Sequence, residues 1–523
     1  ERPDYPELKK SDANIIGHVL DKKTKEHLPY ITIALKGTTI GTVTDATGHY
    51  FLKNLPEGNF ILEVSSVGYK TVTRNVTLKK GKTLEEDFEI EEDAIALDGV
   101  VVSANRSETT RRMAPTLVNV VDLKLFETTN SSTLSQGLNF QPGVRVETNC
   151  QNCGFQQVRI NGLDGPYTQI LIDSRPVFSA LSGVYGLEQI PASMIERVEV
   201  MRGGGSALFG SSAIAGTINI ITKEPLRNSG QLSHTITSLG GSSSFDNNTS
   251  LNASLVTDDH RAGLYIFGQN RYRSGYDYDG DGFTELPKLK NQTVGFRSYL
   301  KTSTYSKLTF EYHHMQEFRR GGDMLNRPPH EAHIAEQLQH SIDGGSLKFD
   351  YFSPDEKNRL SVFASAANTD RDSYYGPGND PLKAYGKTTD LTAMGGAQYV
   401  HTFDKCFFMP SDLTAGLEYN RDRLKDNMWG YNRHTDQTVN IYSAFLQNEW
   451  KNDRWGILIG GRLDKHNMVD NVIFSPRANL RFNPTQNINL RLSYSSGFRA
   501  PQAFDEDMHI ENVGGTVAMI ERA

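Results

Sequence analysis

The sequence predicts a mainly β protein with three parts: a small N-terminal β-sandwich, an α/β domain and a transmembrane antiparallel β-barrel. Three observations support this prediction. Short runs rich in β-branched and aromatic residues alternate with turn sequences near the N-terminus. A stretch crowded with small residues, RGGGSALFGSSAIAGTINIIT, occupies 202–222 and forms a strand-turn-strand pattern. After about residue 231, long segments alternate apolar and polar side chains, as strands do when a sheet has two different faces.

Composition excludes several classes of protein. Of the 523 residues, 37% are hydrophobic, and the mean hydropathy is -0.49. No run approaches the roughly 18 apolar residues that a membrane helix needs, which excludes a helical membrane protein. A membrane β-barrel remains compatible, because its alternating strands have the average hydropathy of a soluble protein. The net charge of -7 and the absence of a basic cluster argue against a nucleic-acid partner.

Residues 14–92 are predicted to form the β-sandwich. The runs IIGHVL, YITIAL, GHYFLKNL and NFILEVSSVGY are short, and turn sequences such as DATG and PEGN separate them. An acidic stretch, EEDFEIEEDAIALDG, leads into the predicted linker at 93–106, which contains three consecutive valines at 100–102. The valines have high strand propensity and no obvious partner strand, so they are available for β-augmentation by another protein. The alternative is an ordinary first strand of the next domain.

A second unit is predicted over 107–225. A helical pattern spans 131–138, and the sequence QIPASMIERVEVMRGGG at 189–205 also looks helical. Glycines between 203 and 216 would permit tight turns and close backbone packing. A phosphate-binding loop is disfavoured, because RGGGSALFG lacks the Lys-Ser/Thr of a P-loop and no capping helix is predicted beside it.

The remaining residues, 226–523, have the alternation of barrel strands. In NINLRLSYSSGF the apolar residues fall at even positions from 488 to 494, whereas Asn489, Arg491 and Ser493 face the other way. The segment NIYSAFLQNEW at 440–450 repeats the pattern with breaks at 445 and 448. A soluble sandwich would also alternate, so the preceding unit is needed to decide between the two.

The order of these units resembles that of TonB-dependent outer-membrane transporters. GTVTDATGHYFLKNLPEGNFILEVSSVGY at 41–69 resembles the carboxypeptidase-regulatory-like extension in front of many such transporters of the Bacteroidetes type. Residues 107–225 resemble the plug that blocks the barrel, and DGVVVSANR resembles the TonB box, which pairs with the periplasmic energy-coupling protein TonB. The resemblance therefore implies a TonB box made of Asp98, Val100, Val101, Val102 and Ser103.

The length of the predicted barrel region leads to a further expectation. Transporters of the resembled family close with 22 strands, whereas the residues after the plug allow roughly 12 to 14 strands of barrel length. An open sheet edge cannot face lipid, because each unpaired amide there costs several kcal/mol. We therefore expect the barrel to be incomplete in this chain and the natural protein to continue past Ala523.

The sequence YDYDGDGFTE is the strongest candidate for a metal site. It places Asp277, Asp279 and Asp281 at alternate positions, followed by Glu285. Alternating carboxylates with a glycine turn resemble half of a calcium loop, and residues 279–283 are similar to a calcium-binding loop of cobalamin transporters. A structural Ca²⁺ is the expected ion, and no catalytic cofactor is expected. A solvated acidic loop is the alternative.

Histidines and cysteines provide weaker candidates. His330 and His333 could lie on one face of a helical turn, but they lack the third ligand of a zinc hydrolase, so ordinary loop histidines are favoured. They remain candidates for contact with haem or a metal. Cys150 and Cys153 form a CxxC for which a disulfide is the first reading and metal ligation the second. Thioredoxin-like redox chemistry is disfavoured, because no βαβ context surrounds the pair.

The resemblance also implies where substrate would bind. GFRAPQAFDEDMHIENVGG is similar to the FRAP box of haem receptors, with His509 as its histidine, although the NPNL motif is absent and cobalamin receptors have a similar box. Substrate contacts are expected from the plug apex and the loops. These contact residues are Cys150, Cys153, Tyr167, Phe178, Tyr185, His330, His333 and His509.

The resemblance implies a non-enzymatic importer of a scarce, bulky nutrient across a Gram-negative outer membrane, with the N-terminal domain in the periplasm. Cobalamin is the first expectation for the substrate and haem the second, ahead of ferric siderophores, copper and oligosaccharides. The expected partners are TonB, outer-membrane lipid and lipopolysaccharide, the small-molecule ligand and a surface lipoprotein. An adhesin or signalling receptor would have no need for a plug, and a zinc peptidase built on His330 and His333 would require metal-dependent hydrolysis.

Overall fold

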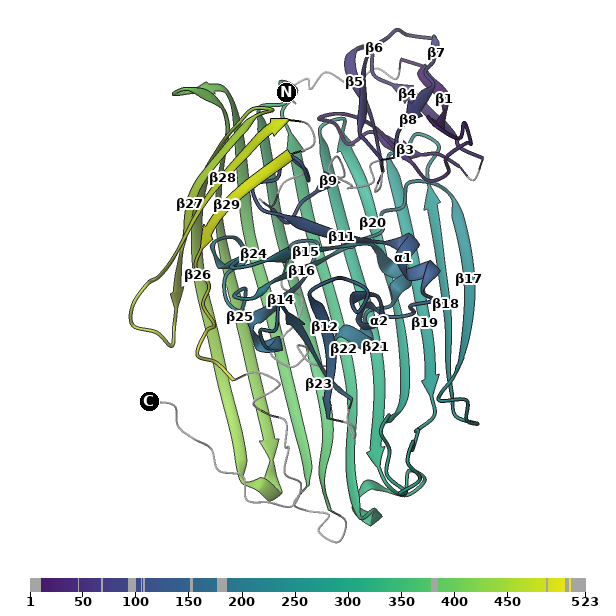
Figure 1. Cartoon of the computed structure of the whole chain (residues 1–523), viewed down its shortest axis with the longest axis vertical. Coiled ribbons are helices and arrows are strands. Elements are labelled where there is room, and N and C mark those ends of the chain that lie inside the picture. The colour runs from purple at the N-terminus through teal and green to yellow at the C-terminus, as the bar shows by residue number, and fades with distance from the viewer. Residues whose placement is uncertain are drawn as a thin grey trace, which may run out of the picture.

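Figure 1 shows the fold of this computed structural model, in which a large curved sheet surrounds a compact domain and a small β domain lies at one end. The structure describes residues 11–45, 47–66, 69–92, 100–104, 106, 109–150, 154–175, 186–377, 384–485, 488–503 and 508. None of the helices in these ranges is both long enough and apolar enough to cross a membrane.

The N-terminal domain is a sandwich of two small sheets. Its strands are β1 (Ala13–Asp21), β2 (Thr32–Leu35), β3 (Gly41–Val43), β4 (His49–Leu55), β5 (Gly58–Ser65), β6 (Val72–Leu78), β7 (Thr83–Glu85) and β8 (Phe88–Ile90). β1 pairs with β4, β7 and β8, and the other sheet has the order β3-β2-β5-β6. Ile15 and Leu52 from the first sheet meet Ile33 and Leu62 from the second in one buried core. The predicted sandwich is confirmed.

The next unit is an α/β domain with a four-stranded sheet. Its elements are β9 (Val100–Val101), β10 (Thr109–Thr110), β11 (Val118–Asp122), α1 (Leu123–Thr128), α2 (Leu134–Leu138), β12 (Val144–Cys150), β13 (Phe155–Ile160), η1 (Gly165–Tyr167), β14 (Thr168–Ile172), α3 (Gly186–Gln189), η2 (Ala192–Met194), β15 (Ile195–Arg202), α4 (Ser206–Phe209) and β16 (Gly216–Thr222). The main sheet has the order β11-β15-β16-β14, while β9 pairs with β10 and β12 pairs with β13.

Two local predictions for this domain were wrong. The segment 189–205 is mostly the strand β15, because it pairs with β11 on one side and β16 on the other and buries Val198 and Val200 in the hydrophobic core. Tertiary pairing of this kind overrides local helix propensity. The short helix α4 also follows the three glycines, where no helix was predicted. The helix predicted at 131–138 is present but shorter.

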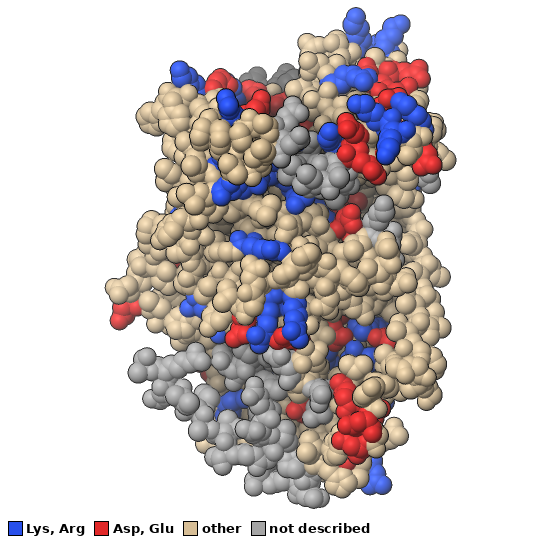
Figure 2. Space-filling view, in the orientation of Figure 1, with Lys and Arg blue, Asp and Glu red and all other residues tan. Residues whose placement is uncertain are grey.

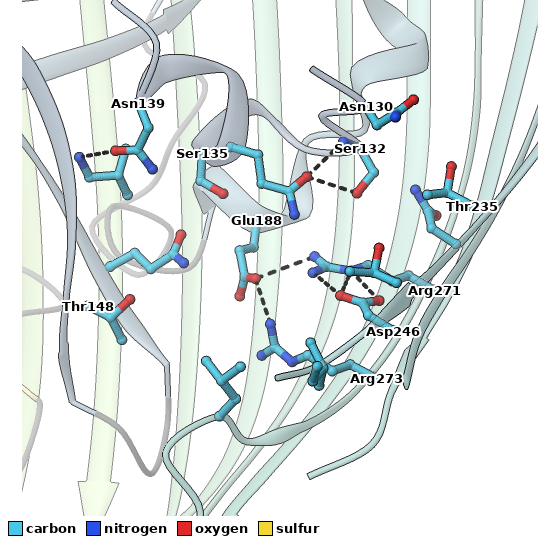
Figure 3. A pocket seen from close by; sticks show the side chains of 17 residues that line it. Asn130, Ser132, Ser135, Asn139, Thr148, Glu188, Thr235, Asp246, Arg271 and Arg273 are labelled. Atoms are coloured by element: carbon cyan, nitrogen blue, oxygen red, sulfur yellow. Dashed lines mark hydrogen bonds and ion pairs between the residues drawn. The ribbon is translucent and has the colours of Figure 1, made fainter. Parts of the chain in front are cut away.

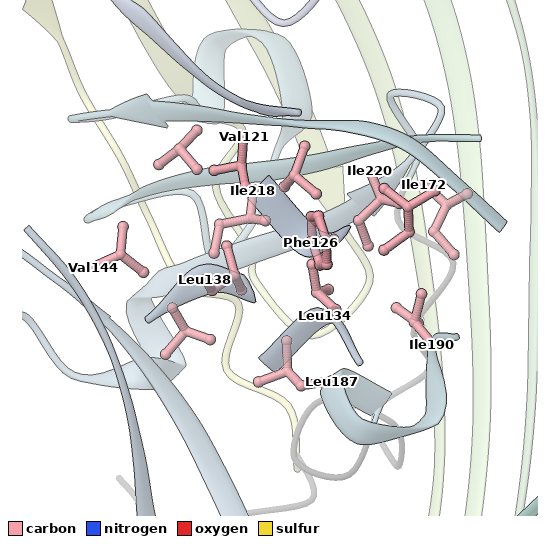
Figure 4. Packing of buried hydrophobic residues seen from close by; sticks show 14 of the residues in the cluster. Val121, Phe126, Leu134, Leu138, Val144, Ile172, Leu187, Ile190, Ile218 and Ile220 are labelled. Atoms are coloured by element: carbon pink, nitrogen blue, oxygen red, sulfur yellow. The ribbon is translucent and has the colours of Figure 1, made fainter. Parts of the chain in front are cut away.

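The core of this inner domain includes residues of the large curved sheet that surrounds it, the wall. Helices α1 and α2 pack against the sheet through Phe126, Leu134 and Leu138 (Figure 4). Tyr265 and Phe267, from a strand of the large sheet, belong to the same buried cluster. The Tyr265 hydroxyl also donates a hydrogen bond to the Ser193 carbonyl at 2.6 Å. The inner domain is therefore seated against the wall by apolar packing as well as by polar contacts.

A glycine in α2 tests how tightly this core is packed. A Cβ added at Gly137 would lie 2.3 Å from Cε1 of the buried Phe126 ring. Alanine normally stabilises a helix by about 1 kcal/mol relative to glycine, but overpacking a core costs about 1–3 kcal/mol. We expect Gly137→Ala to destabilise the inner domain by about 1–2 kcal/mol in urea unfolding. Gly230→Ala, where the added Cβ meets nothing within 4 Å, is the matched control; equal stability of the two variants would contradict tight packing.

One antiparallel sheet of 13 strands makes up the wall. The strands, in chain order and in sheet order, are β17 (Ser229–Ser238), β18 (Phe245–Val256), β19 (Ala262–Arg273), β20 (Lys288–Ser303), β21 (Ser306–Gly322), β22 (Ile334–Phe352), β23 (Asn358–Pro377), β24 (Tyr385–Cys406), β25 (Met409–Met428), β26 (Arg433–Lys451), β27 (Trp455–His466), β28 (Ile473–Thr485) and β29 (Ile488–Ser495). Short helices η3 (Pro329–Glu331) and η4 (Trp429–Tyr431) lie in the loops. The strand count agrees with the 12 to 14 expected, and within the described ranges β17 and β29 are the two edges of the sheet.

The two faces of this sheet differ as predicted. On β29 the outward residues Ile488, Leu490, Leu492 and Tyr494 are 48–72% exposed. The inward face instead buries charged residues, including Arg271, Arg319 and Arg462, which are among the largest fully buried side chains. Apolar side chains therefore cover the outside of the wall, while its inside is polar and faces the inner domain. The break predicted at Phe445 is real, because that ring points inward and is 5% exposed.

The N-terminal sandwich sits at the end of the barrel sheet where the connections are short. The backbone N–H of Thr39 donates to the Thr304 carbonyl at 3.0 Å, within the two-residue turn between β20 and β21. The Arg227 guanidinium lies over the Tyr30 ring, 4.3 Å from its centroid. Figure 2 shows that charged side chains gather over the sandwich, whereas the flanks of the barrel in this view are mostly uncharged. The longer loops, such as 274–287 and 323–333, lie at the opposite end (Figure 1).

Candidate functional site

The acidic loop between β19 and β20 brings all four predicted calcium ligands together. One oxygen from each of Asp277, Asp279, Asp281 and Glu285 lies within 4.8 Å of the others. Asp277 also accepts hydrogen bonds from the backbone N–H groups of 280 and 282, at 2.7 and 2.9 Å, which fold the loop around that carboxylate. In the part of the chain that the structure describes, no other group of three or more Asp, Glu, His or Cys side chains brings its ligand atoms within 4.8 Å of one another. Hard oxygen donors in this number suit Ca²⁺.

The base of this loop is tied to the inner domain through a buried ion cluster. Arg273, at the end of β19, donates through Nε to the Pro287 carbonyl at 3.1 Å and through Nη1 to Glu188 Oε1 at 3.1 Å. Glu188 lies on α3 and also pairs with Arg319 at 2.7 Å and Arg271 at 3.4 Å. One carboxylate of the inner domain therefore contacts three arginines of the wall, one of which also holds the loop.

Electrostatics keep Glu188 ionised. Burial alone would raise the pKa of this carboxyl, but the charges of Arg273, Arg319 and Arg271 hold its pKa well below the usual range. Asp246 and Glu317 pair with Arg271 and Arg319, at 2.6 and 2.7 Å, so three acidic groups balance the three arginines. Glu188 is 6% exposed, and water does little to screen these contacts.

A polar cavity of about 260 Å³ lies beside this cluster, between the inner domain and strands β17 to β19 (Figure 3). Figure 3 shows Glu188 pointing toward Arg271 and Arg273, with Asp246 beside Arg271. Side chains of amides, hydroxyls and charged groups dominate the lining, which is made of Asn130, Ser132, Ser135, Gln136, Asn139, Val146, Thr148, Gln156, Glu188, Thr235, Thr237, Leu239, Asp246, Asn248, Arg271, Arg273 and Leu286. The cavity could hold water or a polar part of a ligand.

The predicted TonB box lies on the side of the inner domain away from the acidic loop, and hydrogen bonds hold it against this domain. Val100 and Val101 pair antiparallel with Thr110 and Thr109, so the expectation that this segment lacks a partner strand was wrong. Val101 is fully buried. This pairing is short, since it covers two residues on each strand. Asp98 lies outside the described residues.

A buried carboxylate holds the rest of the box. Glu199 Oε2, on β15, accepts hydrogen bonds from the backbone N–H groups of Val102 and Ser103, both at 2.9 Å, and from the Ser103 hydroxyl at 2.7 Å. Asn219 donates to the same hydroxyl at 3.0 Å. Glu199 is fully buried. The box is thus docked by side chains of the main sheet rather than by a long strand ladder.

The chain after the box is held by the wall. Arg106 pairs with Glu418 at 2.5 Å, and Arg462 pairs with the other oxygen of Glu418 at 2.7 Å. Arg477, from β28, donates to the Thr116 hydroxyl at 2.9 Å. The interface between the inner domain and the wall is therefore charged and hydrogen-bonded at the box as well as at the acidic loop.

The predicted substrate residues lie in several places. Phe178, Tyr185 and His509 are outside the described residues. Tyr167 is 38% exposed at the end of η1, and its carbonyl accepts the N–H groups of residues 214 and 215. These positions stay predictions.

The cysteine hairpin reaches the wall at the long-loop end. The Cys150 thiol donates to Glu336 Oε2 at 3.0 Å, near the start of β22. Gly154, which closes the hairpin, approaches Arg319 and Pro287, because an added Cβ there would lie 3.0 Å and 3.2 Å from their side chains. Cys150 is a free thiol in the structure, and Cys153 lies outside the described residues, so the disulfide stays a prediction.

The two loop histidines do not share one helical face. Only 329–331 is helical, as the 3-10 turn η3, because His333 already leads into β22. His330 Nδ1 contacts the Tyr385 hydroxyl at 2.9 Å, whereas His333 Nδ1 contacts Asp323 at 2.5 Å. Burial alone would raise the pKa of Asp323, but the hydrogen bonds from His333 and the Ile334 backbone lower it. The two imidazoles therefore have separate polar partners.

Comparison with known families matches three consecutive regions of the chain. Residues 15–102 match the CarboxypepD_reg-like domain, residues 110–217 match the TonB-dependent receptor plug domain, and residues 216–517 match the TonB-dependent receptor-like β-barrel. The last match alone covers more than half of the 523 residues.

The chain belongs to the TonB-dependent receptor family.

The inner domain is accordingly the plug, and the 13-stranded sheet is the barrel wall. Members of this family are outer-membrane transporters and receptors rather than enzymes. The chain is 24% identical over 425 residues to a protein of Vibrio vulnificus named vitamin B12 transporter BtuB, an alignment that covers 78% of this chain and 64% of the relative.

Solved structures show the same fold at lower identity. The siderophore receptor PirA of Acinetobacter baumannii superposes with a TM-score of 0.65 at 19% identity, covering 75% of this chain and 62% of that one. A variant of the ferric enterobactin receptor PfeA of Pseudomonas aeruginosa gives 0.64 at 19% identity, covering 75% and 63%. The chain therefore spans a little under two thirds of the length of these relatives.

Sequence reasoning missed Glu188 and Glu199 as site residues. A signal for the partners of Glu188 was present, because Arg271 and Arg273 alternate on β19 and must share the inward face. Nothing in the spacing around Glu188 or Glu199 distinguishes them from the other acidic residues of the plug.

Proposed function

We propose that this receptor imports cobalamin across the outer membrane, with the sandwich and the TonB box on the periplasmic side. The observation that carries the proposal is the similarity over 425 residues to a protein named as a vitamin B12 transporter. The position of the sandwich at the short-turn end supports the orientation, since outer-membrane barrels have short periplasmic turns and longer extracellular loops.

The acidic loop would bind Ca²⁺ on the extracellular side. Its four carboxylates lie within 4.8 Å of one another, and without a cation they repel each other. Asp277, Asp279, Asp281 and Glu285 would be the protein ligands, and a bound ion would neutralise this charge and fix the loop. An ordered loop presents its remaining side chains to substrate at a lower entropic cost.

A chain of contacts through the plug connects the acidic loop at one end of the barrel with the TonB box at the other. Arg273 joins the base of the acidic loop to Glu188, and Glu188 lies seven residues before β15, which begins at Ile195. β15 in turn contains Glu199, which clasps the TonB box. A ligand that displaces α3 would therefore shift β15, the strand that holds the box. This shift would loosen the hydrogen bonds of Val102 and Ser103.

The short β9–β10 pairing suits exchange with TonB. Two residue pairs are lost when Val100 and Val101 leave Thr109 and Thr110, and an added strand from TonB would supply equivalent main-chain hydrogen bonds. The pull on the box would come from the inner membrane, because the barrel itself has no energy source.

Titration calorimetry of the full-length protein in detergent tests the substrate. Cyanocobalamin and haemin would each be titrated in Ca²⁺ and in chelator. We expect saturable cobalamin binding that Ca²⁺ strengthens. Haemin binding without cobalamin binding would overturn the proposal and assign the receptor to haem.

A second titration tests the acidic loop. Asp279→Asn or Asp281→Asn removes one of the four carboxylates, so we expect Ca²⁺ affinity to fall at least about tenfold, or ~1.4 kcal/mol. Asp470→Asn, an exposed aspartate in the β27–β28 loop at the same end, is the matched control and should leave Ca²⁺ affinity unchanged. Equal Ca²⁺ affinity in all three variants would mean that the loop is only a solvated acidic turn.

A further inference from the structure

Three histidines gather on one outer face of the N-terminal sandwich, away from the acidic loop and the plug. The ring centroids of His18 and His27 are 5.1 Å apart, those of His27 and His49 are 4.9 Å apart, and those of His18 and His49 are 5.8 Å apart. Imidazoles that bind one tetrahedral ion, at a metal–nitrogen distance of about 2.0–2.1 Å, have centroids about 5 Å apart. The spacing of the three rings therefore fits a shared metal ion.

The backbone under these histidines is firmly positioned. His18 on β1 and His49 on β4 are directly opposite each other in the antiparallel register, so their side chains share one face. His27 lies beside them, because residues 20 and 27 form an isolated β-bridge. Gly48 allows this approach: a Cβ there would lie 2.7 Å from the His27 Cβ. Three separate segments of the sandwich thus converge on the same spot.

Hydrogen bonds at two of the rings determine which nitrogen carries the proton and which has the lone pair. His18 Nδ1 lies 3.0 Å from Asp87 Oδ1, and since a carboxylate only accepts, Nδ1 carries the proton. His49 Nδ1 lies 3.1 Å from the Thr47 hydroxyl, which already donates its hydrogen to Asp45 at 2.7 Å. His49 Nδ1 is therefore a donor as well. In the neutral form of each ring the lone pair is therefore on Nε2, and in His18 the Nδ1–H is supported by a carboxylate, as in many histidine metal ligands.

We propose that His18, His27 and His49 form a binding site for a late first-row divalent cation, with Zn²⁺ as the reference ion. Neutral imidazole nitrogens are suitable ligands for zinc, copper and nickel, whereas Ca²⁺ prefers oxygen. Three protein ligands leave a fourth position for water or for a group from another molecule. Asp87 and the pair Thr47–Asp45 orient two of the ligands.

Binding of one ion by all three histidines would require a side chain to rotate. Among the described residues, the acidic loop is the group whose ligand atoms all lie within 4.8 Å of one another. The ring nitrogens of His18, His27 and His49 are therefore farther apart than this limit. His27 is exposed on the turn after β1, and its ring is free to rotate toward the others at little cost in packing. A bound ion would then tie this turn to β1 and β4.

Zinc competition titration of the full-length protein, first stripped with chelator, tests the proposal. We expect one Zn²⁺ per chain at this site, at least about 100-fold weaker binding in His27→Ala, and about 10- to 100-fold weaker binding in Asp87→Asn, which loses the orienting carboxylate. His434→Ala, an exposed histidine on β26, is the matched control and should leave zinc affinity unchanged.

Two further measurements separate this site from the acidic loop and from misfolding. Asp281→Asn should leave zinc affinity unchanged, and His27→Ala should leave Ca²⁺ affinity unchanged. Electron paramagnetic resonance of the Cu²⁺-loaded protein should show nitrogen couplings that weaken in His49→Ala. Zinc binding that survives His27→Ala, or the lack of stoichiometric zinc binding in a folded protein with an unchanged thermal transition, would overturn the proposal.

Discussion

Replacing Glu188 by glutamine should loosen the plug within the barrel by about 3–5 kcal/mol, the cost of breaking a buried ion pair by removing one partner. Glutamine keeps the size of the side chain but leaves Arg271, Arg273 and Arg319 facing a neutral group at 6% exposure. Two of these arginines retain another carboxylate, Asp246 or Glu317, so the main loss falls on Arg273. Urea unfolding of the plug, followed by plug-specific fluorescence or proteolysis, measures the change.

The pH dependence of this effect follows from the direction of the pKa shift. The pKa of Glu188 is lower in the folded protein than in an unfolded chain, so its stabilisation is complete above the unfolded value of about 4.3. The stability gap between the wild type and Glu188→Gln should stay constant from about pH 5 to 8 and narrow as the pH falls below about 4. A gap that changes near neutral pH would show that another group titrates in the cluster.

An exposed carboxylate provides the control for charge alone. Asp164, on the plug surface, pairs with Arg159 at 3.0 Å with its side chain 55% exposed. Exposed pairs contribute about 0–1 kcal/mol, so Asp164→Asn should change plug stability by no more than that. Equal losses in Asp164→Asn and Glu188→Gln would mean that the arginine cluster does not anchor the plug.

The architecture was largely predictable because its signals are local and repeated. The even positions from 488 to 494 are apolar along the whole of β29, and each outward residue independently supports the same face. The sandwich strands also have short β-branched runs between turns, which need no knowledge of tertiary contacts. The segment 195–202 was misread because its sequence, IERVEVMR, carries helix-favouring residues, whereas its strand state depends on β11 and β16, which are distant in sequence.

The site was only partly predictable, because some of its residues are neighbours in sequence whereas others meet only in the folded protein. The acidic loop is contiguous in sequence, so its four carboxylates could be recognised before any fold was known. Glu188 meets Arg319 across 131 positions of sequence, and Glu199 meets Ser103 across 96. Such partners come together only when the plug is seated in the barrel. The three sandwich histidines are likewise separated by strands and a turn, and only the register of β1 and β4 aligns two of them.

Removing the carboxylate of Glu199 should release the TonB box without any ligand. Three hydrogen bonds from Val102 and Ser103 end on this one oxygen, and hydrogen bonds to a charged group contribute about 1.5–3 kcal/mol each. Loss of even one of them is enough to shift the ratio of undocked to docked box about tenfold. In Glu199→Ala we therefore expect amide hydrogen exchange at residues 102 and 103 to accelerate at least about tenfold.

The same variant should bind TonB more tightly, because the box no longer has to be freed first. We expect the affinity of ligand-free Glu199→Ala for the periplasmic domain of TonB to rise at least about tenfold. Glu199→Gln keeps one oxygen acceptor and should fall between the variant and the wild type. Glu196→Ala, on the same strand with its side chain 48% exposed, should behave as the wild type. Unchanged exchange at Val102 and Ser103 in a folded Glu199→Ala protein would assign the docking of the box to the β9–β10 pairing instead, and the strand exchange with TonB would then be the step that sets its release.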